Sequence, residues 1–118
     1  MIKLALLIVV IALLMHTYDL LVNRRNQVVI KGDKPTIMLF YVDWCGYCKK
    51  FMPDWERLSG SMSDNANFVK LNGDKETSMA EKYNVKQYPT IIKVYKNGKM
   101  VVYEDEREMD KLVKFCKK

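Results

Sequence analysis

The sequence predicts an α/β fold in which a mixed sheet is flanked by helices and follows one long apolar segment. Three observations support this prediction. Short runs of β-forming residues alternate with helical periodicity, and the stretch 96–99, Lys-Asn-Gly-Lys, is typical of a tight hairpin turn. Residues 4–15 are an unbroken apolar run. Because the hairpin makes the last two strands antiparallel, we expect a sheet of mixed direction.

The N-terminal segment, residues 1–25, is expected to be a transmembrane signal-anchor. Its apolar character extends over residues 4–22, and nineteen helical residues reach about 28 Å, which approaches the thickness of a bilayer core. A cleaved secretory signal also has a positive start and an apolar centre of this length. However, residues 16–26 contain no Ala, Gly or Ser for a cleavage site. We therefore expect residues 4–22 to stay in the membrane.

The basic residues around this segment indicate a topology. Arg24, Arg25, Lys31 and Lys34 follow the apolar stretch 4–22, whereas only Lys3 and the α-amine precede it. The positive-inside tendency places the richer side in the cytoplasm, so we expect a single-pass protein whose domain lies on the cytoplasmic face. A lumenal or secreted domain is the alternative.

The remaining residues, 26–118, are enough for one small core and too few for two domains. The patterns predict strands at 28–30, 36–42, 67–71, 90–95 and 100–103, and helices at 45–59, at 77–83 and from about 106. The formal net charge is +6, but the basic residues are scattered and no RNA-binding signature accompanies them. We therefore expect no nucleic-acid partner.

The motif that carries chemistry is Cys45-Gly46-Tyr47-Cys48. It lies between an apolar β-type run and a helical pattern, so it should occupy a strand-to-helix turn. At the helix N-terminus, unpaired N–H groups and the helix dipole favour the thiolate of Cys45. We expect Cys45 to attack a disulfide and the more shielded Cys48, one turn further on, to resolve the mixed disulfide.

Two other uses of such a pair are disfavoured. A structural zinc site needs about four ligands, and the only remaining candidates are Cys116 and His16, the latter in the apolar segment. Covalent haem attachment requires His directly after Cys48, where this chain has Lys49. We expect no metal and no organic cofactor, and Cys116 is interpreted as a small buried apolar residue.

Further motifs identify a family resemblance. They are Trp44-Cys45-Gly46-x-Cys48-Lys49, Pro53 in the following helix, and Tyr88-Pro89-Thr90. With them, from about residue 36 onwards, the chain resembles the thioredoxin superfamily, and within it the catalytic domains of protein disulfide isomerases. The resemblance implies a thioredoxin-like three-layer fold and thiol-disulfide oxidoreductase activity. Its implied partners are cysteine-containing protein substrates and a thiol or disulfide that donates or accepts electrons.

The resemblance also assigns roles to individual residues. Trp44 and Tyr88 would line the substrate groove, and Pro89 would follow a cis bond and present backbone groups to an extended substrate. Its alternative is an ordinary trans proline that opens a strand. The nine-residue interval between Pro89 and Gly98 is one residue longer than the family's usual spacing, which predicts a bulge in that strand.

Four residues are expected to support the thiol pair. Gly46 and Tyr47 form the dipeptide that, in the family, tunes the relative stability of thiolate and disulfide. Lys70 and Arg107 match cations that would stabilise the thiolate of Cys48, although a solvated surface charge is the alternative for each.

One departure from the family affects the mechanism. Leu39 occupies the position, six residues before the first cysteine, where the family usually carries a buried acid that accepts the proton of the second thiol. Deprotonation of Cys48 must then use water or another group. This departure supports an alternative function, a membrane-tethered binding scaffold with weak or no turnover, which the intact cysteine pair opposes.

The direction of electron transfer depends on the topology. A cytoplasmic domain would be a reductase or a relay in a dedicated pathway, as in the membrane-anchored thioredoxin-like proteins of large DNA viruses, so a viral membrane is compatible. A lumenal domain would oxidise or isomerise disulfides.

Overall fold

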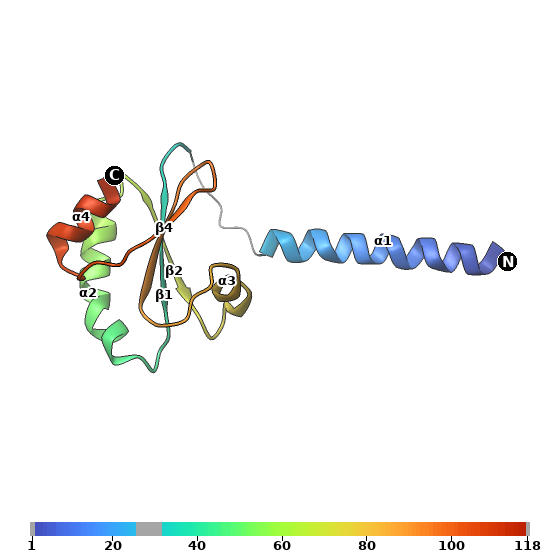
Figure 1. Cartoon of the computed structure of the whole chain (residues 1–118), viewed down its shortest axis with the longest axis horizontal. Helices are drawn as coiled ribbons and strands as arrows, with labels where there is room; N and C mark the ends of the chain where they lie inside the picture. Colours follow the sequence, from blue (N-terminus) through green and yellow to red (C-terminus); the bar gives the residue numbers. More distant parts are fainter. Residues whose placement is uncertain (1, 26–31, 118) are drawn as a thin grey trace.

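The computed structural model describes residues 2–25 and 32–117 and confirms a thioredoxin-like α/β fold with a mixed sheet. In chain order the elements are α1 (Ile2–Arg25), β1 (Thr36–Tyr41), α2 (Gly46–Ser61), β2 (Asn67–Asn72), α3 (Thr77–Lys82), β3 (Thr90–Val94), β4 (Met100–Val102) and α4 (Met109–Lys117). Figure 1 shows α1 projecting away from the other elements, which gather around the sheet. The strand expected at 28–30 lies outside the described residues.

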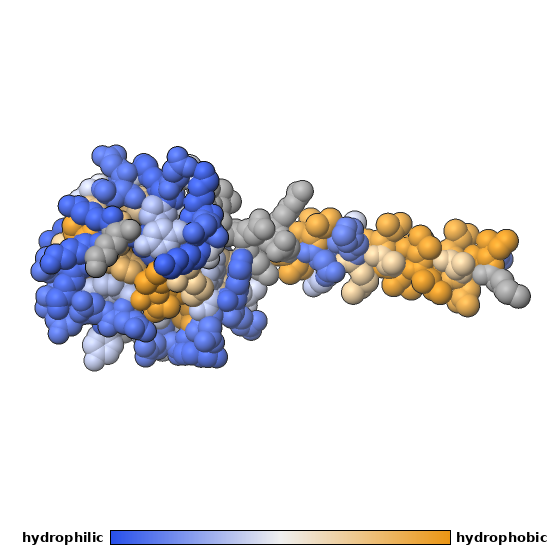
Figure 2. Space-filling view, turned by 45° about the horizontal axis from the view of Figure 1, so that its top comes forward, coloured by the Kyte–Doolittle hydropathy of each residue, from blue (hydrophilic) through white to orange (hydrophobic). Residues whose placement is uncertain are grey.

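Helix α1 has the length and composition of a membrane-crossing helix. The 21 residues Ile2–Val22 have a mean hydropathy of 2.3, and none of the most apolar window is buried against the rest of the chain. Such a helix is about 32 Å long, close to the thickness of a bilayer core. A signal sequence near an N-terminus shares these properties. Figure 2 shows the contrast between the apolar α1 and the mainly hydrophilic surface of the domain.

The sheet is built around β1, a run of β-forming residues of which five out of six are buried. The strand order is β2-β1-β3-β4. Strand β1 runs parallel to β2 and antiparallel to β3, and β4 pairs antiparallel with β3. The antiparallel pairing expected from the turn at 96–99 is therefore confirmed.

Alternate side chains of β1 face two separate cores. Ile37 and Leu39 point to the side covered by α2 and α4, where Trp55 and Leu112 are buried. Phe40 and its neighbour two residues earlier point to the other side, which α3 covers. Figure 1 shows α2 and α4 on one side of the sheet and α3 on the other, which gives the three layers.

Helix α2 carries the thiol motif on a firmly packed element. Phe51, Trp55 and Leu58 follow one another at helical spacing and are all buried. The Trp55 ring meets Phe68 edge-on, with 5.4 Å between ring centroids. Because this face is buried against the sheet, the N-terminus of α2 is held in place beside the end of β1.

Two local predictions were wrong. The bulge expected in β3 does not occur, because the pairing with β4 is continuous from Ile92 to Val94. The Tyr95 N–H donates to the Lys99 carbonyl at 2.8 Å, so residues 96–98 form a three-residue loop in which Gly98 has φ +89°.

Helix α4 begins at Met109 and not near Glu106 as predicted. The Asp105 carboxylate accepts a hydrogen bond from the Glu106 N–H, and the Tyr103 hydroxyl donates one to the Glu106 carbonyl. These local bonds offer the backbone an alternative to the first helical turn.

A lysine is buried in the core beneath α4. The Lys93 side chain is 1% exposed, and its Nζ donates to the Phe115 carbonyl at 2.8 Å. The ammonium also lies 4.9 Å from the ring centroid of Tyr95. It thereby ties β3 to the last turn of α4. The neighbouring Cys116 is buried, as expected, and burial raises the pKa of its thiol to about 11 against the opposing charge of Lys93.

Candidate active site

The first motif cysteine caps the helix that follows it. Cys45 has extended backbone and is the N-cap of α2, and its Sγ accepts a hydrogen bond from the Cys48 N–H at 3.2 Å. The same Sγ donates to the Tyr88 carbonyl at 3.7 Å. A sulfur at this position faces the unpaired N–H groups of the first helical turn, which favour negative charge. The strand-to-helix placement predicted for the motif is confirmed.

The second cysteine is more deeply placed, at 2% exposure compared with 8% for Cys45. Burial raises the pKa of the Cys48 thiol to about 11, and the adjacent Cys45 adds to the rise. A hydrogen bond from the Val42 backbone and the charge of Arg107 both act in the opposite direction. Both cysteines are free thiols in this structure. The protonated form of Cys48 is therefore the resting form at neutral pH.

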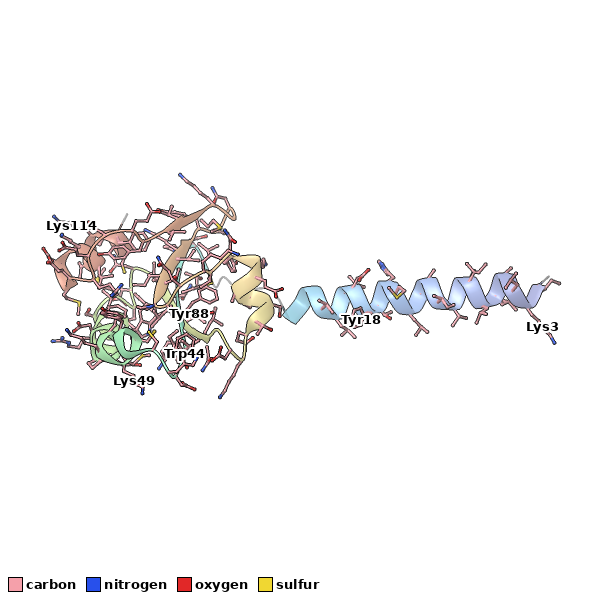
Figure 3. The ribbon with its side chains drawn as sticks, turned by 60° about the horizontal axis from the view of Figure 1, so that its bottom comes forward. Lys3, Tyr18, Trp44, Lys49, Tyr88 and Lys114 are labelled. Carbon is pink, nitrogen blue, oxygen red and sulfur yellow. The ribbon has the colours of Figure 1, made fainter. Side chains whose placement is uncertain are left out.

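Aromatic side chains form a rim beside the thiols. The rings of Trp44 and Tyr88 meet edge-on with 6.4 Å between centroids, and Figure 3 shows the two side chains near each other. The indole Nε1 of Trp44 donates to Asp74 Oδ2 at 2.9 Å, although the side chain is 72% exposed. The bond between Tyr88 and Pro89 is cis. The structure thus gathers Trp44, Tyr88 and Pro89 beside Cys45, and their role in binding a substrate stays a prediction.

The position of the Tyr88 ring depends on Gly73, at the turn after β2. A Cβ added to Gly73 would lie 2.1 Å from the Tyr88 hydroxyl oxygen and 2.5 Å from the adjoining ring carbon. The Gly73 N–H also donates to the Tyr41 carbonyl at 2.8 Å, which holds the glycine against the end of β1. Only a residue without a side chain lets the ring lie here.

The supporting residues are placed differently from one another. Tyr47 is 70% exposed at the start of α2, and the space around Gly46 is open. Arg107 lies with Tyr47 along a shallow cavity beside α2, and its charge lowers the pKa of Cys48. Lys70 forms an exposed ion pair with Glu56 at 2.8 Å, so the structure does not bring its ammonium to Cys48.

Residues at the ends of β1 and β2 complete the site and were missed by the sequence analysis. Asn72 is 8% exposed, and its Nδ2 donates to Asp43 Oδ2 at 3.3 Å. Its Oδ1 accepts from the Asp74 N–H at 3.0 Å. The Asn-Gly-Asp run that begins at the last residue of β2 was the available signal, because such residues mark tight turns. Leu39, at the position of the family's acid, is 1% exposed and packs in the core.

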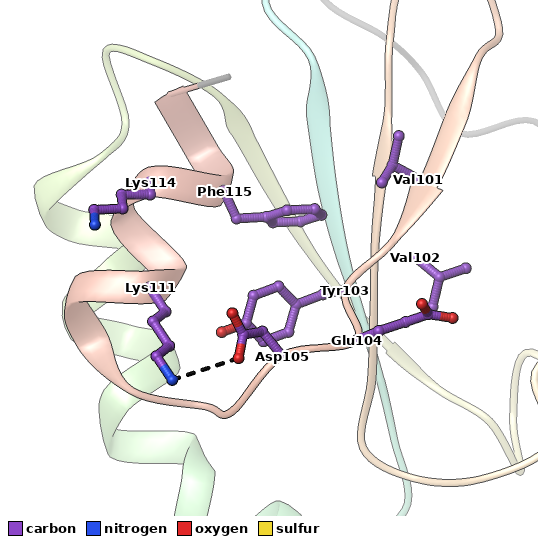
Figure 4. A pocket seen from close by; sticks show the side chains of 8 residues that line it. All are labelled: Val101, Val102, Tyr103, Glu104, Asp105, Lys111, Lys114 and Phe115. Carbon is purple, nitrogen blue, oxygen red and sulfur yellow. Dashed lines mark ion pairs between the residues drawn. The ribbon is translucent and has the colours of Figure 1, made fainter.

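A separate cavity of about 570 Å³ lies between β4, the following loop and α4. Figure 4 shows its lining residues and the ion pair, 3.5 Å long, between Lys111 and Asp105. None of its lining residues is a cysteine. Among the described residues, no group of three or more His, Cys, Asp or Glu side chains is arranged to hold a metal ion. The thiol pair is thus the chemically reactive feature of the described domain.

Comparison with known proteins agrees with the geometry. The thioredoxin family model matches residues 18–118. Protein disulfide-isomerase A4 from Bos taurus is 35% identical over 98 residues, covering 80% of this chain and 15% of that protein. Protein disulfide-isomerase erp38 from Neurospora crassa is 31% identical, covering 82% of this chain and 27% of that protein. The chain therefore spans only a fraction of the length of these relatives.

Solved structures show the same likeness. The first thioredoxin domain of mouse protein disulfide-isomerase A4 has a TM-score of 0.65 and 29% identity, covering 73% of this chain and 62% of that one. Thioredoxin from Malassezia sympodialis has a TM-score of 0.64 and 28% identity, covering 75% of this chain and 76% of that one.

Proposed function

Because the chain belongs to the thioredoxin family, we propose that it is a membrane-anchored thiol-disulfide oxidoreductase that acts on protein cysteines. The observation that carries this proposal is the placement of Cys45. Its thiol caps α2, contacts the Tyr88 carbonyl and has a second free thiol one helical turn away. The curated relatives named as protein disulfide isomerases support the same chemistry.

In the reductive direction the steps are two disulfide exchanges. The Cys45 thiolate attacks one sulfur of a client disulfide, and the other client sulfur leaves as a thiolate. Cys48, once deprotonated, attacks the Cys45 sulfur of the mixed disulfide and releases the second client sulfur. The motif is now oxidised to a disulfide, and the client has gained two electrons. The oxidative direction is the reverse of these steps.

The surface beside Cys45 suits an extended client segment. Trp44 and Tyr47 are large exposed side chains next to the motif. Aromatic surfaces of this kind bury apolar client residues at a small cost in side-chain entropy. The backbone around Tyr88 and Pro89 would pair with the client main chain, as an added strand does at a sheet edge.

The anchor and the topology complete the proposal. Helix α1 is long and apolar enough to hold the domain at a membrane, and the basic residues that follow its apolar span Ile2–Val22 favour a cytoplasmic domain. A cytoplasmic domain would act as a reductase, whereas a lumenal one would oxidise or isomerise disulfides. Protease added to the cytoplasmic side of sealed membranes should digest the domain, and complete protection would reverse the assignment.

A binding scaffold is the competing function, and the burial of Leu39 together with the raised pKa of Cys48 favours it. The test compares full-length chains carrying Cys48→Ser with chains carrying both Cys45→Ser and Cys48→Ser. An enzyme should capture clients as mixed disulfides with the single variant, release them on reduction and capture none with the double variant. Partners recovered equally by both variants would instead support the scaffold.

A further inference from the structure

The resolving thiol lines an open cavity between the end of β1 and the first turns of α2. The cavity has a volume of about 480 Å³ and is lined by Tyr41, Val42, Asp43, Cys48, Lys49 and Met52. A water molecule occupies about 30 Å³ in the liquid, and this cavity is large enough for several. Cys48 is 2% exposed, so the cavity is its route to solvent.

The core side of Cys48 offers no proton acceptor. The buried polar or charged residues within the described parts of the chain are Thr36, Asn72 and Lys93, and none of them is a carboxylic acid. Leu39, at the sequence position of the family's buried acid, is an apolar residue of the core. A base for Cys48 must therefore act from the cavity side.

Asp43 is the acid in that cavity, and its carboxylate is held in place. The Asn72 side-chain amide donates to Asp43 Oδ2 at 3.3 Å, while its own carbonyl oxygen is fixed by the Asp74 N–H at 3.0 Å. Because Asn72 is 8% exposed and bonded at both ends, it holds in place the carboxylate of a residue that lines the cavity. The neighbouring Val42 N–H acts directly on the Cys48 sulfur, so both groups converge from the same loop.

We propose that Asp43 is the proton acceptor for Cys48 and acts through water in this cavity. The inference rests on the function proposed above and concerns its second step. The Cys48 thiol gives its proton through water to the Asp43 carboxylate, and the resulting thiolate attacks the Cys45 sulfur of the mixed disulfide. The client sulfur leaves with the electron pair of the broken bond, and the Asp43 carboxylic acid returns its proton to solvent or to the departing thiolate.

A test of this proposal must separate the effect of Asp43 from the effects of the other titratable groups around Cys48. The Cys45 thiol and the charge of Arg107 act on Cys48. Asp43, Lys49 and Tyr41 line the same cavity as Cys48. Of these, Asp43 is the carboxylate, the group able to accept a proton while Cys45 is held in a mixed disulfide. Lys49 and Arg107 stabilise a thiolate but accept no proton.

The experiment follows the reduced full-length chain in detergent micelles after mixing with dithiobis(nitrobenzoate). Attack by Cys45 releases one thionitrobenzoate rapidly, and resolution by Cys48 releases the second. The variants are Asp43→Asn and Asp43→Glu, and Asp64→Asn is the matched control. Asp64 is an exposed acid in the turn after α2, outside the cavity. A chain with Cys45→Ser and Cys48→Ser gives the contribution of Cys116.

Asp43→Asn should leave the first release unchanged and slow the second by about 100-fold at neutral pH, the lower end of the range for general-base catalysis. The deficit should shrink as the pH rises, because hydroxide replaces the missing base. Asp43→Glu should resolve at nearly the original rate, and Asp64→Asn should match the unchanged chain.

Equal second phases in Asp43→Asn and the unchanged chain would overturn this inference alone. So would a deficit that is constant with pH or one that Asp43→Glu shares, because either result indicates a structural effect. An unchanged chain that releases no second thionitrobenzoate would overturn the proposed oxidoreductase function and this inference with it.

Discussion

Replacing Gly73 with alanine tests how the turn after β2 shapes the thiol site. In the present structure the Tyr88 ring lies directly over Gly73, beside the cluster formed by Val42 and the two motif cysteines. The added methyl group would lie 2.1 Å from the Tyr88 hydroxyl oxygen, whereas ordinary contacts begin near 3.4 Å. The ring would have to move by more than an ångström, because the backbone of Gly73 is tied to Tyr41.

The energetic cost follows from that displacement. Overpacking of this kind costs about 1–3 kcal/mol. Separation of the Tyr88 and Trp44 rings, now 6.4 Å apart, adds about 0.5–1.5 kcal/mol. For a domain of this size each kcal/mol lowers the Tm by about 4–8 °C. Gly73→Ala should therefore lower the Tm measurably and make Cys45 more accessible to alkylating reagents.

Thermal unfolding of the full-length chain in detergent, followed by near-ultraviolet circular dichroism, measures the effect. Gly60→Ala is the matched control, because Gly60 lies within α2 and its added Cβ would meet nothing within 4 Å. That change should stabilise the chain by up to about 1 kcal/mol through helix propensity. If Gly73→Ala unfolds at the same temperature as the unchanged chain, the assigned packing of Tyr88 against Gly73 is refuted.

Three further changes test the electrostatics of the domain. The pKa values of the Cys48 and Cys116 thiols rise from 9.0 to about 11 on folding, so their contribution to stability is complete below pH 9 and declines as the pH rises toward 11. Each thiol should therefore lower the free energy of unfolding, measured with urea, by about 1.4 kcal/mol at pH 10. A free energy of unfolding that does not change between pH 8 and 10 would contradict this expectation. Lys93→Ala should lower the free energy of unfolding by about 2–5 kcal/mol in the same assay, because it leaves a cavity in the core and removes the donor to the Phe115 carbonyl. Lys93→Met should recover part of that loss, because the longer apolar side chain refills the cavity. Arg107→Gln should raise the pKa of Cys48 further, because it removes a charge that lowers this pKa. In a chain lacking the other motif cysteine, the pH profile of Cys48 alkylation should shift to higher pH. An unshifted profile would show that Arg107 has no electrostatic effect on Cys48.

The parts of the fold set by local signals could be predicted from the sequence. The run after Pro35 became the buried central strand β1, and the helical spacing of Phe51, Trp55 and Leu58 became the buried face of α2. The strand-to-helix placement of the thiol motif follows from these two patterns. Each pattern reflects which side chains are buried, and tertiary packing keeps the same side chains buried.

Features made by contacts between distant segments could not be predicted. The sequence around Lys93 does not indicate that this lysine is buried, because the carbonyl that accepts its hydrogen bond belongs to Phe115 in the last turn of α4. Likewise, the fit of Tyr88 over Gly73 and the bond from Asn72 to Asp43 exist only after β1, β2 and the loop before β3 meet. The first turn expected for α4 was lost to side-chain hydrogen bonds that helical periodicity does not reveal.

The redox equilibrium of the motif tests the central claim most directly. The full-length chain would be equilibrated in glutathione buffers of graded ratio, and its remaining thiols would be alkylated and located by mass spectrometry. Cys45 and Cys48 should lose their reactivity together in one two-electron transition, with a potential between about −270 and −180 mV, while Cys116 stays reduced. A value near the lower limit indicates a reductase, and one near the upper limit an oxidase or isomerase. Persistence of both motif thiols across the whole series would contradict the assignment of Cys45 and Cys48 as a redox pair.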